Sequence, residues 1–470
     1  MFAFLKKLRE IEVFRNFSYL TVGGVLSQAI GLFTLIKIAA IYSPDNYGLY
    51  TFLLIQGQLI ITVGDLGIRN VVIRSIARNP EKTKTLLRAG TFLKISAVVT
   101  LSVLYLGYNA IWGHLDPMEV ALISMFGILN CLTNLFESVF IGHQKMLPIS
   151  VINITANAIW FGFVMLLPEE NISVSFLFSA FIILNLAKAL IQYWYLKYKN
   201  FVIGETSNLY DSAIKLVKES WPFLSLTLLM LPVNYFSNNF LDINSTQEEL
   251  GYFNLAQKLM MPINLIIGFA LSAIFPNLSS LWTKNKEKFY RYITVGIKYY
   301  IISALILCFL FTLFAREVVV ILFSDEYLPA IQVCQLQVWY VFLMSVNSSI
   351  GTIWASTNKE KLILKSGIVN AILSTPLLFI GSKYGALGLS YGYVASFVLF
   401  EIYLWNVFKK SEQLKIKKDA LIWISAAGLF LLSYFIPQEL ALLYRILIAA
   451  VLGSFLALYM YKTKALAELK

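Results

Sequence analysis

The chain has 470 residues, of which 58% are hydrophobic and 14% are charged, and its formal net charge is +12. A composition this apolar excludes an ordinary soluble domain and indicates a polytopic membrane protein. The basic residues lie in short clusters between apolar segments instead of on one soluble face, so nucleic acid is not an expected partner.

Apolar segments of about 20 residues recur along the chain, and a helix of that length crosses a hydrocarbon core of roughly 30 Å. Strands that span a bilayer would be about 10 residues long and would alternate in polarity, which these segments do not. We therefore predict an all-α membrane protein with about 14 transmembrane helices. The predicted spans cover residues 17–41, 49–68, 89–112, 118–141, 146–167, 173–196, 221–241, 255–274, 293–315, 328–350, 362–382, 386–407, 420–436 and 442–461.

The distribution of Lys and Arg predicts the orientation of these spans. About 31 of the 38 basic residues fall in the two terminal segments and in every second loop, whereas acidic residues dominate the other loops. Because cytoplasmic loops retain positive residues, both termini are predicted to be cytoplasmic. The basic N-terminal segment lacks a small-residue cleavage site, so it is not expected to be a removable signal peptide. The basic amphipathic stretch 65–78 is predicted to anchor the chain at the inner surface.

Two weak internal repeats predict the domain organisation. The stretch DNYGLY at residues 45–50 resembles EELGYF at 248–253, and a Lys that precedes an Asn by eight or nine residues occurs at Lys145 and again at Lys361. The two offsets, about 203 and 216 residues, indicate two parallel six-helix halves, an architecture of transporters.

We accordingly predict two lobes that are related by a pseudo-twofold axis along the membrane normal. Residues 1–200 would form the N-terminal lobe with helices 1–6, and residues 201–410 the C-terminal lobe with helices 7–12. Residues 411–470 would add two C-terminal helices outside the repeat.

Signatures of soluble enzymes are absent from the sequence: it has no P-loop, no nucleophile elbow and no cluster of His, Cys and carboxylates at metal-binding spacing. We therefore expect no enzymatic activity, no cofactor and no metal site. Without a P-loop, transport would draw on an ion gradient, the membrane potential or the substrate gradient.

Ionisable side chains inside apolar spans are costly and mark candidate sites. The predicted spans contain the cations Lys37 and Lys188, which are candidates for contacts with an anionic substrate. They also contain Asp65, Glu137 and Glu401, which are candidates for ion coupling or for counter-charge.

Structural roles compete with each of these assignments. A buried ion pair between Lys188 and Glu137 is as well supported as a substrate contact. Asp65 is four residues before Arg69, so a pair on one helix face is favoured over coupling. Lys94 is predicted to reach the inner interface with its amine, and Lys37 could reach the outer interface in the same way.

Amide side chains form a second pattern in the spans. Asn153 and Asn157 are four residues apart, as are Asn234 and Asn238, so the members of each pair share a helix face. Hydrogen bonds between helices are the default role for such amides. Contacts with sugar hydroxyls are the alternative. Separately, three prolines within or beside the seventh and eighth spans, Pro222, Pro232 and Pro262, are each predicted to permit a bend.

Five motifs occur in a fixed order: SPDNYGLY, GDLGIRNVVIRSIAR, EELGYFNLAQKL, VVVILFSDEYLPAIQVCQLQ and KYGALGLSYGYVASF. In the order and spacing of these motifs the chain resembles the polysaccharide-biosynthesis flippases, and the resemblance covers about residues 14–410. These flippases are the O-antigen and exopolysaccharide repeat-unit translocases of the multidrug/oligosaccharidyl-lipid/polysaccharide exporter superfamily. The chain departs from the family pattern at Asn238 and Asn239, where an acid is frequent.

The resemblance implies that the protein translocates an undecaprenyl-diphosphate-linked oligosaccharide repeat unit to the outer leaflet by alternating access. It further implies a location in the bacterial cytoplasmic (inner) membrane. A lipid-linked oligosaccharide is then the substrate, the lipid bilayer the surroundings, and the polysaccharide polymerase and chain-length machinery are candidate partners.

Two alternatives remain open. A cation-coupled multidrug exporter of the same superfamily would favour deep acids and a less basic cavity. A membrane glycan polymerase or ligase would place Arg, His or acids in a sizeable outer loop, and no predicted outer loop is large.

Overall fold

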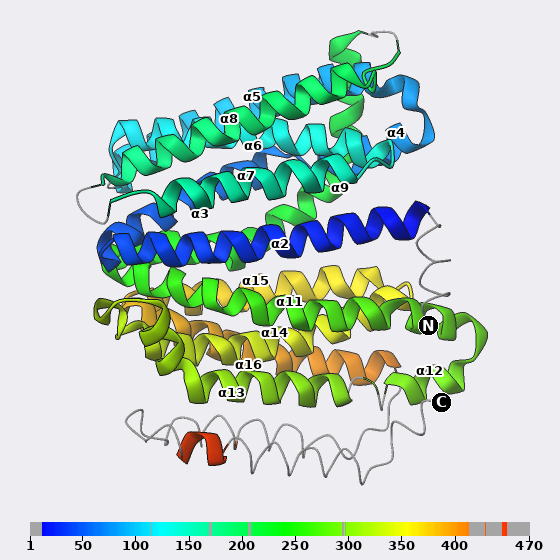
Figure 1. The fold of residues 1–470 in the computed structure, drawn as a ribbon. Coiled ribbons are helices and arrows are strands. Elements are labelled where there is room, and N and C mark those ends of the chain that lie inside the picture. Colours follow the sequence, from blue (N-terminus) through cyan, green and yellow to red (C-terminus); the bar gives the residue numbers. More distant parts are fainter. Residues whose placement is uncertain are drawn as a thin grey trace. The chain divides into compact units, whose positions relative to one another are not determined.

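The computed structural model describes residues 12–113, 115–168, 172–204, 208–293, 296, 298–412, 428 and 444–448, and this part of the chain is helical with no strand (Figure 1). The predicted all-α class is thereby confirmed. The described helices are, in chain order, α2 (Glu12–Ile41), α3 (Pro44–Gly64), α4 (Ile68–Arg78), η1 (Pro80–Lys82), α5 (Thr83–Trp112), α6 (Pro117–Gly142), α7 (Leu147–Met165), α8 (Val174–Tyr198), α9 (Leu209–Leu231), η2 (Pro232–Phe236), α10 (Ser237–Asn244), α11 (Gln247–Lys284), α12 (Lys286–Tyr292), α13 (Lys298–Leu322), η4 (Asp325–Tyr327), α14 (Ala330–Ser356), α15 (Glu360–Ser382) and α16 (Gly385–Glu412).

The chain is a multi-pass membrane protein. Ten helices of the described part are long and apolar enough to cross a membrane, or eleven if the bent pair Leu209–Leu229 and Pro232–Asn244 is one span. Of the three prolines predicted to permit a bend, Pro232 lies at this one and begins the π-helical turn η2. Pro222 lies inside α9 and Pro262 inside the continuous helix α11, so bends at these two positions stay predictions. The two last predicted spans, 420–436 and 442–461, lie almost wholly outside the described residues, so the count of fourteen stays a prediction.

Contacts between Cα atoms divide the chain into two compact units, Met1–Asn238 and Asn239–Lys470. In the first unit, α2 packs on α7, and α6 packs on α3, α4, α5 and α8. In the second unit, α14 packs on α11, α13 and α16, and α16 also packs on α15. The predicted lobe boundaries at residues 200 and 410 stay predictions.

The repeated motif opens a helix at both of its occurrences. Asp45 lies in the first turn of α3, and Glu248 lies in the first turn of α11. The aromatic side chains that follow are buried: Tyr50 is 1% exposed and Phe253 is 0% exposed. Each copy therefore combines a carboxylate at the positive end of the helix dipole with a buried aromatic anchor one turn later.

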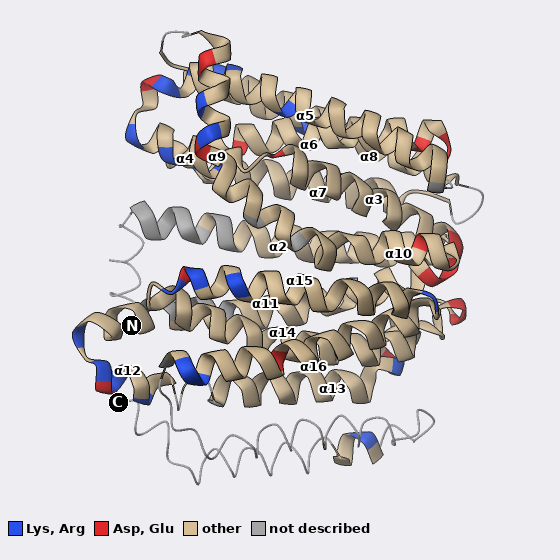
Figure 2. Ribbon diagram, turned by 180° about the vertical axis from the view of Figure 1, so that it is seen from behind, with Lys and Arg blue, Asp and Glu red and all other residues tan. Residues whose placement is uncertain are grey.

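Charged residues gather near the ends of the helices in each unit (Figure 2). Lys and Arg are prominent around α4 and the first turns of α9 in one unit and around α12 in the other (Figure 2). This is the pattern from which the sequence predicts cytoplasmic termini, and the orientation itself stays a prediction.

A tight turn at Asp65–Gly67 separates α3 from α4. Leu66 and Gly67 both have a positive φ, 52° and 68°. A Cβ atom on Gly67 would lie 2.8 Å from the Leu224 backbone nitrogen and 2.9 Å from the Ser220 carbonyl oxygen, both in α9. Only glycine combines this backbone conformation with so close an approach of two helices.

The apolar face of α4 is buried inside the protein. Ile68, Val71, Val72 and Ile76 are at most 1% exposed and belong to a core cluster that includes side chains of α5, α6 and α9. The prediction that residues 65–78 act as a membrane-surface anchor is therefore wrong. A basic amphipathic helix has the same pattern whether its apolar face meets lipid or protein.

We expect Gly67→Ala to destabilise the first unit by about 1–3 kcal/mol, because it adds left-handed backbone strain and a clash with α9. Thermal melting of the purified protein in detergent measures the loss. Gly162→Ala in α7 is the matched control, since a Cβ there meets nothing within 4 Å. Equal melting temperatures for the two variants would contradict the packing described.

Candidate functional site

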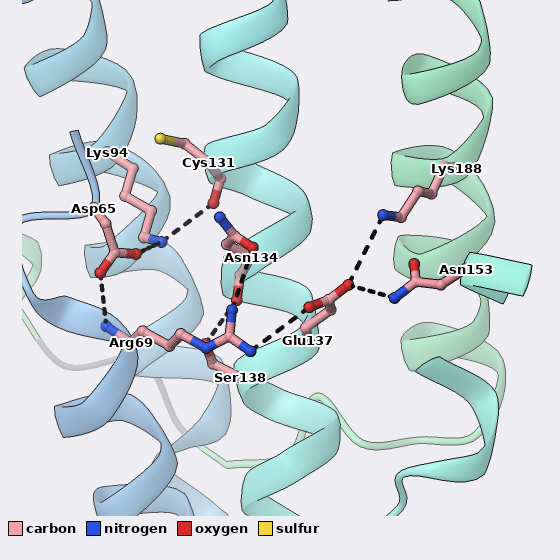
Figure 3. A network of polar contacts seen from close by, with 9 residues as sticks. All are labelled: Asp65, Arg69, Lys94, Cys131, Asn134, Glu137, Ser138, Asn153 and Lys188. Atoms are coloured by element: carbon pink, nitrogen blue, oxygen red, sulfur yellow. Dashed lines mark hydrogen bonds and ion pairs between the residues drawn. The ribbon is translucent and has the colours of Figure 1, made fainter. Parts of the chain in front are cut away.

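A network of polar contacts joins five helices of the first unit, and Figure 3 shows its nine residues. At one end, the Lys94 ammonium from α5 donates to Asp65 Oδ1 at 2.5 Å and to the Cys131 carbonyl oxygen of α6 at 3.2 Å. The Lys94 side chain is 0% exposed and that of Asp65 is 20% exposed. The prediction that Lys94 extends to the membrane interface is wrong, because its amine has a carboxylate partner inside the protein.

Arg69 connects the two halves of the network. Its backbone N–H donates to Asp65 Oδ2 at 3.5 Å, while its guanidinium donates to Asn134 Oδ1 at 3.3 Å. The predicted side-chain pair of Asp65 with Arg69 assumed one continuous helix. The turn at residues 65–67 interrupts that helix, so the Arg69 side chain is directed to α6 and the Asp65 carboxylate to Lys94.

Glu137 of α6 is the centre of the other half. Arg69 Nη2 lies 3.7 Å from Glu137 Oε2, and Lys188 Nζ from α8 lies 3.9 Å from Oε1. Asn153 of α7 donates its side-chain N–H to Oε1 at 3.2 Å. The predicted pairing of Lys188 with Glu137 is therefore present. Three donors share one carboxylate that is only 11% exposed, as a buried charge requires.

The network carries a surplus of positive charge. It contains three cations, Lys94, Arg69 and Lys188, and two carboxylates, Asp65 and Glu137. The Lys94 side chain is fully buried, whereas the side chains of Lys188 and Arg69 are 18% and 38% exposed. An ammonium has three donors and a guanidinium five, and the ion pairs of 3.7 and 3.9 Å with Glu137 leave donor capacity on both residues. This arrangement suits an anion that approaches from the Arg69 end.

The remaining candidates lie apart from these contacts. Lys37 is partly buried near the end of α2. Asn157 donates to the Ser27 carbonyl oxygen at 3.2 Å and so joins α7 to α2, as expected of an amide between helices. Asn234 is exposed in η2, and Asn238 is 1% exposed in α10. Glu401 belongs to the second unit.

Sequence reasoning thus grouped Glu137 with Lys188 but missed Lys94, Arg69 and Asn134 as members of one network. The available signal was depth: several ionisable residues fall near the same end of neighbouring predicted spans. In the part of the chain that the structure describes, no group of three or more His, Cys, Asp or Glu side chains could hold a metal ion.

Lys94→Met should destabilise the first unit by about 3–5 kcal/mol, because it leaves the Asp65 carboxylate without its buried partner. The double variant Asp65→Asn with Lys94→Met should be markedly more stable than Lys94→Met alone, since it removes both charges. Melting temperatures in detergent test this cycle.

An exposed pair is the control for that cycle. Arg74 Nη2 lies 3.1 Å from Glu219 Oε2, with side chains 44% and 38% exposed. Arg74→Met should therefore cost no more than about 1 kcal/mol. A loss for Arg74→Met that equals the loss for Lys94→Met would show that burial does not set the strength of these pairs.

Solved structures show the same fold at low identity. A lipid II flippase, MurJ, in an inward closed conformation has a TM-score of 0.71 and 14% identity, with 94% of this chain and 99% of that chain covered. An inward-facing multidrug resistance MATE family transporter of the MOP superfamily has a TM-score of 0.62 and 13% identity, with 83% and 96% covered. A MOP superfamily transporter from Pyrococcus furiosus has a TM-score of 0.56 and 13% identity, with 86% and 96% covered.

No curated protein matches the sequence significantly. The family model described as polysaccharide biosynthesis protein matches residues 13–282, which is more than half of the chain and includes the whole charged network. The family predicted from the sequence motifs is therefore confirmed, and the chain belongs to the polysaccharide biosynthesis protein family.

Proposed function

We propose that the protein is a flippase that translocates an undecaprenyl-diphosphate-linked oligosaccharide repeat unit from the cytoplasmic to the outer leaflet by alternating access. The observation that carries this proposal is the partly accessible network with surplus positive charge in a membrane-embedded member of a polysaccharide biosynthesis family. The setting proposed is the bacterial inner membrane, with both termini in the cytoplasm.

The chemistry of such a substrate defines what the protein must supply. A diphosphate that carries sugars is anionic and strongly polar, so its passage through hydrocarbon is prohibitive unless cations and hydrogen-bonding groups replace water. An isolated buried cation would itself be costly. Asp65 and Glu137 offset that cost for three cations while leaving one positive charge uncompensated.

The proposed roles follow from this arrangement. Lys188, together with Lys37 of α2, contacts the diphosphate or an acidic sugar, and Glu137 and Asp65 supply counter-charge. Among the amides, Asn234 is exposed and suits a contact with sugar hydroxyls. Asn153 and Asn157 already donate to Glu137 and to the α2 backbone, and Asn238 is buried.

The comparison proteins support the proposal at the level of fold. By its printed name, the MurJ structure is that of a lipid II flippase, so a flippase uses this fold. The proposed partners beyond the bilayer and the substrate are a polysaccharide polymerase and its chain-length machinery.

A cation-coupled multidrug exporter is the second candidate, and the similarity to a MATE family transporter favours it. The surplus positive charge argues against it as the primary activity. A cationic drug would be repelled by Lys188 and Arg69, whereas an anionic lipid diphosphate would be attracted.

We expect Lys188→Ala and Lys37→Ala each to lower translocation at least about tenfold, since the loss of one charge-assisted contact costs about 1.5–3 kcal/mol. Translocation is measured in cells that make the same glycan, as the fraction of lipid-linked oligosaccharide accessible from the outer leaflet. Lys188→Arg keeps the charge and should retain most of the activity.

Lys383→Ala is the matched control, because Lys383 is exposed at the end of α15. If Lys37→Ala and Lys188→Ala both translocate at the level of Lys383→Ala, the cationic site is refuted. If deletion of the gene changes drug susceptibility and leaves surface glycan intact, the exporter is the correct function.

A further inference from the structure

Glu401 is a buried acid that has no hydrogen-bond partner in the part of the chain that the structure describes. It lies in the second half of α16, its residue is 3% exposed, and both of its carboxyl oxygens lack a hydrogen-bond partner among the described residues. No step of the proposed diphosphate binding uses it, since it belongs to the second unit and the charged network belongs to the first.

The other inward-facing acids of the described structure have partners, which makes Glu401 an exception. Their partners are a cation, an amide or a backbone N–H: Asp65 with Lys94, Glu137 with Arg69, Lys188 and Asn153, Glu317 with Arg445, Glu249 with the Ala386 N–H, Asp242 with Gln247, and Glu119 with the Asp116 N–H. Each of these carboxylates thus has a donor, whereas Glu401 has none in the described part of the chain.

The residues that flank Glu401 one turn away on α16 are aromatic or apolar. One turn before it, Phe397 packs edge-on against Tyr340 of α14 at 4.8 Å between ring centroids, and the neighbouring Phe400 contacts both Phe397 and Tyr403. Leu404, one turn later, is 1% exposed. None of these side chains donates a hydrogen bond to Glu401, so none of them replaces the hydration of a carboxylate.

α16 packs on α11, α14 and α15, and no ionisable group of the described part of these helices makes a hydrogen bond or ion pair with Glu401. The ionisable residues of α15 all lie in its first two turns and are exposed. The ionisable groups are Glu248, Glu249, Tyr252, Lys258 and Lys284 on α11, Cys334 and Tyr340 on α14, Glu360, Lys361 and Lys365 on α15, and Tyr391, Tyr393, Tyr403, Lys409, Lys410 and Glu412 on α16 itself.

Two ligands could remove the cost of this isolated charge. A metal cation would need several oxygen ligands, and no group of three or more His, Cys, Asp or Glu side chains among the described residues could hold one. A proton needs only the carboxylate. Moreover, if position 401 had only a structural role, a permanently neutral residue would be more stable there, because an acid adds the risk of a buried charge.

We propose that Glu401 is the proton-binding site of the second unit: it holds a proton in the conformation described here and releases it when the conformation changes. In release, the O–H bond of the carboxylic acid breaks, the proton passes to water, and the carboxylate remains. The transport consequence rests on the proposed flippase function, whereas proton occupancy does not.

Infrared spectroscopy of the purified protein in lipid vesicles tests occupancy directly. At neutral pH, the wild type should show the carbonyl stretching band of a protonated carboxylic acid. This band should be lost in Glu401→Gln and in Glu401→Leu, the second of which suits the apolar surroundings. It should persist in Glu360→Gln, which changes an exposed acid at the start of α15. A wild type without the band, or a band that persists in full in Glu401→Gln, overturns the proposal.

Coupling is tested in vesicles that contain extracted lipid-linked oligosaccharide. A gradient of one pH unit should change the wild-type ratio of substrate between the leaflets by up to about tenfold, because each coupled proton contributes that factor. Glu401→Gln and Glu401→Leu should show no response, and Glu360→Gln should respond as the wild type does. A wild-type response in Glu401→Gln overturns the proposal. If no variant and no wild-type protein translocates the lipid, the flippase function fails, and the infrared band still decides whether Glu401 holds a proton.

Discussion

The pair of Lys94 and Asp65 sets the geometry on which the rest of the first unit depends. A fully buried ammonium is tolerated only with a carboxylate beside it, so the end of α3 must lie against α5 with Asp65 facing inward. That carboxylate also accepts the backbone N–H of Arg69, which fixes the start of α4. The direction of the Arg69 side chain, and with it the link to Glu137, follows from this one pair.

Apolar packing holds the same turn from its other side. Gly67 allows α9 to approach the turn closely, and the buried face of α4 joins the core cluster with α6. The helix thus has two functions along its length: its apolar face stabilises the unit, and Arg69 at its first turn connects two carboxylates. The seven residues GDLGIRN contain both the glycine that allows the close approach of α9 and the charged residues Asp65 and Arg69.

Sequence reasoning recovered what depends on composition and periodicity. Each described span falls within or around a predicted apolar segment, and the aromatic motif opens α3 and α11 as expected. The errors concern charged side chains near the turn. Helical spacing paired Asp65 with Arg69, but two consecutive residues with positive φ break that spacing. No local rule identifies Lys94 as the partner, because the contact joins residues 29 positions apart on different helices.

The pairing of Glu137 with Lys188 was predictable for a reason that does not apply to Glu401. Two opposite charges at similar depth in neighbouring spans are expected to pair, because each is costly inside the membrane without a partner. For an acid without such a counterpart, the sequence leaves coupling and counter-charge equally open. The structure excludes the counter-charge role for Glu401, because no described cation lies within ion-pair distance of its carboxylate. What remains is a division of labour within one chain. The first unit retains fixed charges by pairing them, which suits an anionic lipid diphosphate, while the second unit buries an acid whose charge depends on a proton. A carrier that moves a charged substrate at the expense of a proton gradient needs both kinds of group, one that stays charged throughout the cycle and one that does not.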